Sequence, residues 1–402
     1  PSGARMGRHL TVWNDATGIV ESALVNQEMN PYPLIFEPSF KPRIWGGRRL
    51  ESVVGKRLPA TGSIGESWEL SDLESDPSRV ANGPARGKTL GEMVQLWGAD
   101  LLGRAALVEG RFPLLIKFLD AAETLSVQVH PDAAVASASG GRVRIKNEAW
   151  YVVWADPGAF ILRGVREGTT KEALRAAVES GNVEGVLQRI PVRKGLAYYL
   201  PSGTVHALGA GAVVAEVQTP SDVTYRLHDW SRVDPSTGRP RELHIEEGLA
   251  CASLEPVATK AEKPEHVASL WTAITGLVRC ESFVIERCRM VEGLDIEIPY
   301  AEMVVWIVLE GRGSIVVAGH EEAFGFGVGD VVLLPAGLRG GRVRTERPCM
   351  WLEVAVPVRS SLSDFDRPSR AARSGPAETK LVPLNVPRRE RGGEGAGPRG
   401  EC

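Results

Sequence analysis

The sequence predicts a mainly β protein with two β-rich regions and a small helical insertion, and three observations support this prediction. The 402 residues include 44 glycines and 27 prolines, a composition that favours many short strands and turns over long helices. Short apolar runs and apolar–polar alternation begin near Pro33 and recur to about Val358. The tetrapeptide pattern Leu-Pro-x-Gly occurs at 200–203 and again at 334–337, a weak internal repeat. The length suffices for two or three domains with a large core.

The elements follow in order along the chain. Short strands with turns are expected from Pro33 to about Asp72, and helical spacing of apolar residues predicts a helix over 88–103 that ends at Gly103. Capping residues Thr169 and Thr170 precede apolar residues at helical spacing, which predicts two short helices over 169–190. We expect strands over 112–121 and 125–131, paired with each other, and further strands over 148–156, 195–208 and 211–219.

The second β-rich region extends from about Leu254 to Val358, and both chain ends differ in composition from the rest. Met29 stands where the sequence becomes strand-like, and the tail after Val358 is rich in Arg, Gly, Pro and Ser. We therefore predict an extension, mostly disordered, over 1–28 and a mostly disordered tail over 359–402. The two domains are predicted over 29–253, with the helical insertion near 167–190, and over 254–358.

Composition limits the classes of partner. The formal net charge of −3 gives no reason to expect a nucleic acid or a membrane surface as partner. The apolar run at 303–309 is far too short to span a bilayer. The five cysteines are scattered and form no Cys-x-x-Cys pair, which is typical of free thiols in a reducing cytoplasm. We expect a cytoplasmic protein that is a monomer or a weak homodimer.

The segment Leu125–Asp132 has an unusual polar face. Leu125, Val127 and Val129 alternate as one buried face of a strand, so Ser126, Gln128 and His130 point together to the other face. A lone Gln-x-His pair is usually part of a hydrogen-bonded core or of a surface. A second pattern, Pro-x-Gly-x-x-His206, occurs after the strand at 195–200. The two patterns in this order and context favour a joint role.

The Pro-x-Gly turn followed by His206 resembles the second motif of the cupin family, which consists of small jelly-roll barrels. The resemblance implies two cupin jelly rolls, of which the second has Gly340 where the first has His206. Cupins usually bind a metal with His-x-His, a glutamate on the next strand and the motif histidine. The matching residues here are Gln128, His130, Glu148 and His206. Their mixed oxygen and nitrogen donors suit Zn²⁺ and leave it a formal charge of +1.

We expect one zinc ion per chain, bound by the first jelly roll, and a second jelly roll without metal. Within the second region the histidines are His266, placed before the strands begin, and His320. His320 is followed by Glu321 and Glu322, and consecutive strand residues point to opposite faces. Three or four convergent ligands are needed for a stable zinc site.

Longer stretches, including LSVQVHPD, NEAWYVV, SGTVHALGAGAVVAEVQTPSDVTYRLHDW and the early WGGRRL and GESWELS, resemble the type I phosphomannose isomerases, particularly the short bacterial form. The resemblance extends from about Pro33 to Pro357. It implies a zinc-dependent aldose–ketose isomerase, with zinc at the four residues above. Such an enzyme interconverts mannose 6-phosphate and fructose 6-phosphate by proton transfer through a cis-enediol. The sugar phosphate is then the expected partner.

The same resemblance assigns further site residues. Arg226, Lys146 and Glu216 are the expected catalytic residues, and Lys117, Ser126 and Asp222 are the expected substrate-binding residues, of which Lys117 and Ser126 match family residues near the phosphate. Arg226 either holds the phosphate or polarises the hydroxyls, and the alternative is a surface arginine paired with Asp229. Lys146 and Glu216 are both candidates for the proton carrier, and Lys146 should share the inward strand face of Glu148. His228 and His244 are expected to be structural or surface residues.

Two other functions compete with the isomerase. A non-catalytic bicupin that binds a sugar phosphate and holds zinc structurally would need neither Lys146 nor Arg226. A cupin oxygenase would generally hold iron with more histidines than this segment offers.

Overall fold

The structure is a computed structural model that describes residues 29–235, 237–257 and 265–358. These residues belong to one compact unit that ends at Val358. The expectations for residues 1–28 and 359–402 lie outside the described residues. Within the described residues no helix is both long and apolar enough to cross a membrane.

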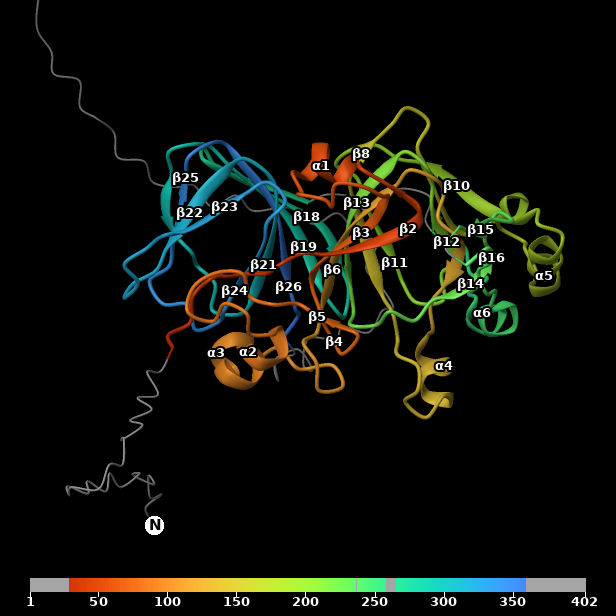
Figure 1. The fold of residues 1–402 in the computed structure, drawn as a ribbon, viewed down its shortest axis with the longest axis horizontal. Helices are drawn as coiled ribbons and strands as arrows, with labels where there is room; N and C mark the ends of the chain where they lie inside the picture. Colours follow the sequence, from red (N-terminus) through yellow and green to blue (C-terminus); the bar gives the residue numbers. More distant parts are fainter. Residues whose placement is uncertain (1–28, 236, 258–264, 359–402) are drawn as a thin grey trace, which may run out of the picture. The chain divides into compact units, whose positions relative to one another are not determined.

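Two antiparallel sheets form the first jelly roll (Figure 1). One has five strands in the order β10 (Leu187–Pro191), β9 (Phe160–Val165), β12 (His206–Leu208), β7 (Val127–Val129) and β14 (Tyr225–His228). The other has six strands in the order β11 (Ala197–Leu200), β8 (Glu148–Ala155), β13 (Ala212–Gln218), β6 (Leu115–Ala121), β3 (Ile64–Leu70) and β2 (Ser39–Gly47). Two short hairpins accompany them, β4 (Asp72–Leu73) with β5 (Asp76–Pro77), and β15 (Val233–Asp234) with β16 (Arg239–Pro240).

Two further antiparallel sheets form the second jelly roll. The larger has the order β1 (Leu34–Ile35), β24 (Val331–Leu334), β21 (Val304–Glu310), β26 (Cys349–Ala355), β19 (Val284–Met290), β18 (Thr272–Arg279) and β17 (Glu265–Ala268). The smaller has the order β20 (Asp295–Glu297), β25 (Arg342–Thr345), β22 (Arg312–Val316) and β23 (Phe324–Gly327). The predicted mainly β fold with two jelly rolls is confirmed. The domain boundary at 253/254 stays a prediction, and β1 adds an N-terminal strand to the second roll by pairing with β24.

The buried side chains place these sheets in layers. One apolar cluster, which includes Trp150, Ile161 and Leu208, fills the space between the two sheets of the first roll. Another, which includes Phe118, Tyr151 and Ile307, joins the six-stranded sheet to the seven-stranded sheet. A cluster around Trp306 and Trp351 lies inside the second roll. Helices α5 (Lys171–Glu179) and α6 (Ile245–Cys251) cover the outer face of the five-stranded sheet.

The helices differ from the prediction in their bounds. The helix expected over 88–103 is two helices, because Gly98 has a positive φ of 48° and ends the first of them. A capping box of Thr89 and Glu92 begins this first helix, and Gly103 ends the second as predicted. In the insertion, Thr170 caps α5, but the second predicted helix is a single 3₁₀ turn followed by β10. The two helices at 88–103 are α2 (Leu90–Trp97) and α3 (Ala99–Leu102), and the 3₁₀ turn is η1 (Val183–Val186). Two further helices are α1 (Arg49–Val54) and α4 (Ala133–Ala138).

Three local predictions were wrong. The strands expected over 112–121 and 125–131 do not pair, because the chain crosses between them from the six-stranded sheet to the five-stranded sheet. His266 lies within β17 rather than before the strands. His320 to Glu322 lie in the loop between β22 and β23, so strand alternation does not separate their side chains.

Candidate metal centre and adjoining cavity

Strand alternation on β7 directs polar side chains into the first jelly roll. Val127 and Val129 pack outward against the layer of α5 and α6, so Gln128 between them faces inward. His130 follows β7 directly and is almost fully buried. His206 on β12 lies opposite Gln128 in the strand register, and Glu148 begins β8 in the facing sheet. The four predicted metal ligands therefore lie in one interior region.

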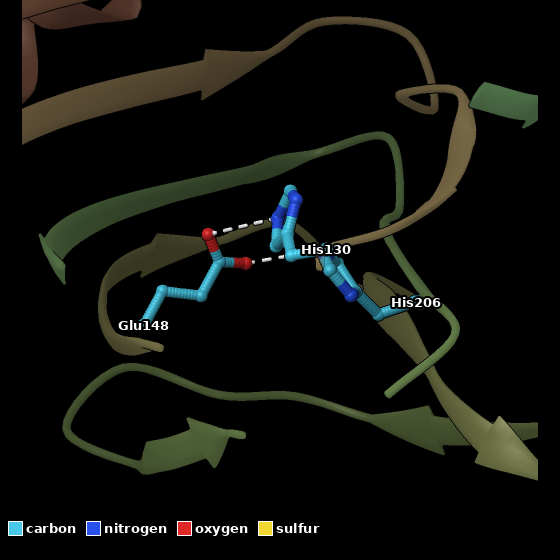
Figure 2. Close-up of side chains that lie close together, drawn as sticks. All are labelled: His130, Glu148 and His206. Atoms are coloured by element: carbon cyan, nitrogen blue, oxygen red, sulfur yellow. Dashed lines mark ion pairs between the residues drawn. The ribbon is translucent and has the colours of Figure 1, made fainter. Parts of the chain in front are cut away.

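The carboxylate of Glu148 points toward both imidazole rings (Figure 2). Its Oε2 lies 3.2 Å from His130 Nε2, and its Oε1 lies 3.0 Å from His206 Nε2. The opposite ring nitrogens contact backbone carbonyls: His130 Nδ1 lies 3.1 Å from Val223 O, and His206 Nδ1 lies 2.8 Å from Thr204 O. A ring nitrogen beside a carbonyl carries the proton, so in each neutral ring Nε2 presents a lone pair to Glu148.

Electron pairs thus face one another at the centre of this cluster, an arrangement that a cation stabilises. The ligand atoms of His130, Glu148 and His206 all lie within 4.8 Å of one another, and neither Glu148 oxygen makes a hydrogen bond of regular geometry. Tetrahedral ligands at about 2.1 Å from zinc are separated by roughly 3.4 Å, slightly more than the oxygen–nitrogen distances of 3.2 and 3.0 Å found here. Imidazoles held through Nδ1 by carbonyls are also typical of metal-ligating histidines.

Gln128 completes the set of candidate ligands. Its Nε2 lies 3.2 Å from His206 Nε2. Rotating the amide by half a turn brings Oε1 to this position, and the two amide atoms have nearly the same shape. The residues present therefore fit a metal ion with oxygen and nitrogen ligands.

Lys146 is the positive charge next to this cluster. Its Nζ lies 2.9 Å from Glu148 Oε2 and 3.1 Å from His130 Nε2. Burial followed by the Lys146 charge lowers the pKa of His130 to about 3, so the ring is neutral at physiological pH. Burial alone would raise the pKa of Glu148, but Lys146 and the histidines lower it well below its ordinary value. Lys146 precedes β8 in a loop, so its inward direction comes from the loop rather than from strand alternation.

A cavity of about 900 Å³ adjoins the cluster. The structure brings all six predicted catalytic and substrate-binding residues to its walls, along with the candidate ligand Gln128. They are Lys117, Ser126, Lys146, Glu216, Asp222 and Arg226.

Glu216 and Lys117 face each other across β13 and β6. They are direct partners in the strand register, and Lys117 Nζ lies 3.5 Å from Glu216 Oε1. Trp150 Nε1 donates to Glu216 Oε2 at 2.9 Å, while Oε1 has no hydrogen-bond partner among the described residues. Burial followed by the Glu148 charge raises the pKa of Glu216. The arrangement leaves one carboxyl oxygen available to a bound molecule.

Arg226 lies opposite Gln128 in the register of β14 and β7. Its Nη1 donates to Glu242 O at 2.7 Å, and its buried Nε has no hydrogen-bond partner among the described residues. Asp229, the partner expected in the alternative, accepts hydrogen bonds from Arg232 and Arg241, and the role of Arg226 stays a prediction. His244 Nδ1 accepts from the Arg226 backbone, and His228 packs against Trp230.

Sequence reasoning missed Glu66 and Trp68 on β3, which also line the cavity. Glu66 accepts from Arg43 Nε and from Trp68 Nε1, both at 2.7 Å. Burial opposes the carboxylate of Glu66, but Lys117 and Arg43 lower its pKa to about 2. The spacing of two residues within GESWELS was the available signal, because it places both side chains on one strand face.

Known proteins resemble this chain over most of its length. Residues 34–151 match the family described as phosphomannose isomerase type I, catalytic domain. The mannose-6-phosphate isomerase ManA of Bacillus subtilis (strain 168) is 35% identical over 311 residues, 77% of this chain and 95% of the relative. This chain belongs to the type I phosphomannose isomerase family.

Solved structures of phosphomannose isomerases share the fold. The crystal structure of the mannose 6-phosphate isomerase from Bacillus subtilis has a TM-score of 0.72 and 33% identity, and covers 81% of this chain and 99% of its own. A zinc-bound holo mannose 6-phosphate isomerase has a TM-score of 0.62 at 17% identity, again over 81% of this chain and 99% of its own. The family predicted from the sequence motifs is confirmed.

Proposed function

We propose that this protein interconverts mannose 6-phosphate and fructose 6-phosphate by moving a proton between C1 and C2. The observation that carries the proposal is the juxtaposition of a buried His–Glu–His cluster with a cavity lined by lysines and arginines. A sugar phosphate is an anion with adjacent oxygens at C1 and C2. The site offers cationic side chains for the phosphate and a metal-binding cluster for the two oxygens. Membership in the phosphomannose isomerase family supports the same substrate.

Gln128, His130, Glu148 and His206 would hold one zinc ion. The mixture of two imidazoles, one carboxylate and one amide oxygen suits zinc. When bound, zinc supplies Lewis acidity that polarises the substrate oxygens at C1 and C2. Val223 and Thr204 hold the two imidazoles through Nδ1 and so fix which nitrogen faces the ion.

Lys146 and Glu216 are the two candidates for the proton carrier. A cis-enediol route needs one group that takes a proton from one carbon and returns it to the next on the same face. Lys146 lies beside the metal ligands, and Glu216 Oε1 pairs with Lys117 but makes no hydrogen bond among the described residues, while Trp150 donates to Oε2. Both line the cavity.

The other cavity residues bind and orient the substrate in this proposal. Arg226 lies next to Gln128 in the strand register and would polarise the hydroxyls closest to the metal. Lys117 adds positive charge close to Glu216. Ser126 is buried and Asp222 is exposed at the cavity wall, and both offer hydrogen bonds to hydroxyl groups. We further propose the cytoplasm as the site of the reaction, since the four described cysteines are free, and a monomer or weak homodimer as the active form.

A coupled assay of fructose 6-phosphate formation from mannose 6-phosphate, with and without a chelator, tests the function. The proposal expects turnover that the chelator abolishes and that added zinc restores. A zinc-containing protein that binds mannose 6-phosphate without turning it over would instead be the non-catalytic sugar-phosphate-binding bicupin.

A further inference from the structure

Two arginine side chains bind one buried carboxylate next to the cavity, and a third arginine interacts with it electrostatically. Asp229 accepts from Arg232 Nη2 at 2.5 Å, and from Arg241 Nε at 2.8 Å and Nη2 at 2.5 Å. Arg226 is the third arginine and interacts electrostatically with this group. The three guanidinium groups thus outnumber the one buried carboxylate among them.

The other cations of the cavity have carboxylate partners of their own. Among the described residues that line it, Lys41 pairs with Asp76 at 2.6 Å and Arg43 with Glu66 at 2.7 Å. Lys117 and Lys146 pair with Glu216 and Glu148. Near the three arginines the other acids are Glu123 and Glu242, whose side chains are 62% and 84% exposed, and Asp222 and Asp234, which line the cavity. Solvent screens the exposed rim charges, so Arg226 and Arg241, which have the one carboxylate of Asp229 buried near them, supply positive charge at this end of the cavity.

The fold orders these groups relative to the metal ligands. His206, Gln128 and Arg226 occupy neighbouring register positions on β12, β7 and β14. The segment after Arg241 lies along β14, because His244 N donates to Arg226 O and Arg226 Nη1 donates to Glu242 O, both at 2.7 Å. Neighbouring strands are about 4.8 Å apart, so the segment that follows Arg241 lies on the side of β14 away from β7 and its candidate ligand Gln128. A sugar phosphate has its phosphate at the end opposite C1 and C2.

We propose that Arg241 binds the phosphate of the substrate and that Asp229 is the positioning residue that holds its guanidinium toward the cavity. The proposal rests on the function proposed above and gives Arg226 the place nearer the reacting carbons. The two bonds to Asp229 use Nε and Nη2 of Arg241, so Nη1 can donate to a phosphate oxygen. The guanidinium groups attract a phosphate dianion, and guanidinium forms strong charge-assisted hydrogen bonds with phosphate. Burial followed by the Arg241 charge lowers the pKa of Arg226, which fits the crowding of positive charge here.

The test compares Arg241→Gln and Asp229→Asn with Arg239→Gln in the zinc-loaded, full-length protein. Arg239 is a matched control, since it lies two residues away on the same hairpin, is exposed and does not line the cavity. Three quantities are measured: KM and kcat for mannose 6-phosphate, the inhibition constant of inorganic phosphate, and the dissociation constant of mannose 6-phosphate by calorimetry. The last quantity tests Arg241 even if the wild type proves not to be an isomerase. Thermal melting shows that each variant is folded.

Arg241→Gln should raise KM, the phosphate inhibition constant and the dissociation constant by about 10- to 100-fold, the range for a lost charge-assisted hydrogen bond, with kcat within about threefold of the wild type. Asp229→Asn should shift the same quantities in the same direction, and Arg239→Gln should leave them within about twofold. The proposal is overturned if Arg241→Gln binds phosphate and mannose 6-phosphate as the wild type does, or if Arg239→Gln weakens them equally. A loss in kcat alone would also overturn it, because it would place Arg241 at the reacting atoms.

Discussion

Replacing His206 by Ala should remove most of the zinc affinity. His206 Nε2 lies 3.0 Å from Glu148 Oε1, and the ring packs edge-on against Trp150 at 5.4 Å between centroids. Four-ligand zinc sites in peptides bind with about 10–16 kcal/mol, so equal shares assign about 2.5–4 kcal/mol to one ligand. The dissociation constant for zinc should therefore rise on the order of 10²- to 10³-fold. The same reasoning applies to His130→Ala, because His130 Nε2 lies 3.2 Å from Glu148 Oε2.

The assay is a competition titration of zinc with a chromophoric chelator, followed by elemental analysis of dialysed protein and by isomerase activity. His206→Asn is a second variant whose side chain fills most of the volume of the ring. Loss of zinc in this variant can therefore be separated from loss of folding. His228→Ala is the matched control, because His228 packs against Trp230 away from the ligand cluster and should keep full zinc. Full zinc occupancy in folded His206→Ala would refute the reasoning and remove His206 from the ligand set.

Three further predictions concern the residues beside the metal ligands, Asp229 and the C-terminal segment. Arg226→Ala and Lys146→Ala should keep zinc and fold but lose about 2–4 kcal/mol of transition-state stabilisation, which is roughly 30- to 1000-fold in kcat, and activity within about threefold of the wild type would exclude both from the chemistry. Burial alone would raise the pKa of Asp229, yet Arg241 and Arg232 hold it below its ordinary 3.8, so the stability that this carboxylate contributes is complete above pH 3.8 and is lost as the pH falls through the lower pKa of the folded state. The melting temperature of Asp229→Asn should therefore fall less on acidification than that of the wild type. Parallel curves of melting temperature against pH would contradict this prediction. Deleting residues 366–402 should leave melting and isomerase activity unchanged, because that segment has no periodic apolar face to bury, and precipitation or loss of most activity would show that it packs on the body.

The sequence predicted the parts of the site that depend on local periodicity. Alternation around Gln128 places it inward between Val127 and Val129, which pack against the helices. The turn before His206 and the glutamate at the start of β8 lie where the motif resemblance expected them. Local patterns of this kind survive folding, because strand geometry alone fixes which side chains share a face.

Features that depend on long-range pairing could not be predicted from periodicity. The crossing from β6 to β7 between sheets follows from which partners the strands find, β13 and β3 for one and β12 and β14 for the other. Lys146 reaches the cluster from a loop, where side-chain direction has no fixed period. Arg241 reaches the cavity wall because Asp229, twelve residues earlier, holds it, and no pattern in the sequence marks this pair.

Activity measured while zinc is added back to metal-free protein tests the central claim most directly. The account holds that one zinc ion at Gln128, His130, Glu148 and His206 makes the adjoining cavity an isomerase site. Conversion of mannose 6-phosphate should rise in proportion to added zinc and reach its plateau at one equivalent per chain, with no equivalent retained by His206→Ala. Full activity in the metal-free protein, or a plateau near two equivalents with the second surviving His206→Ala, would contradict it.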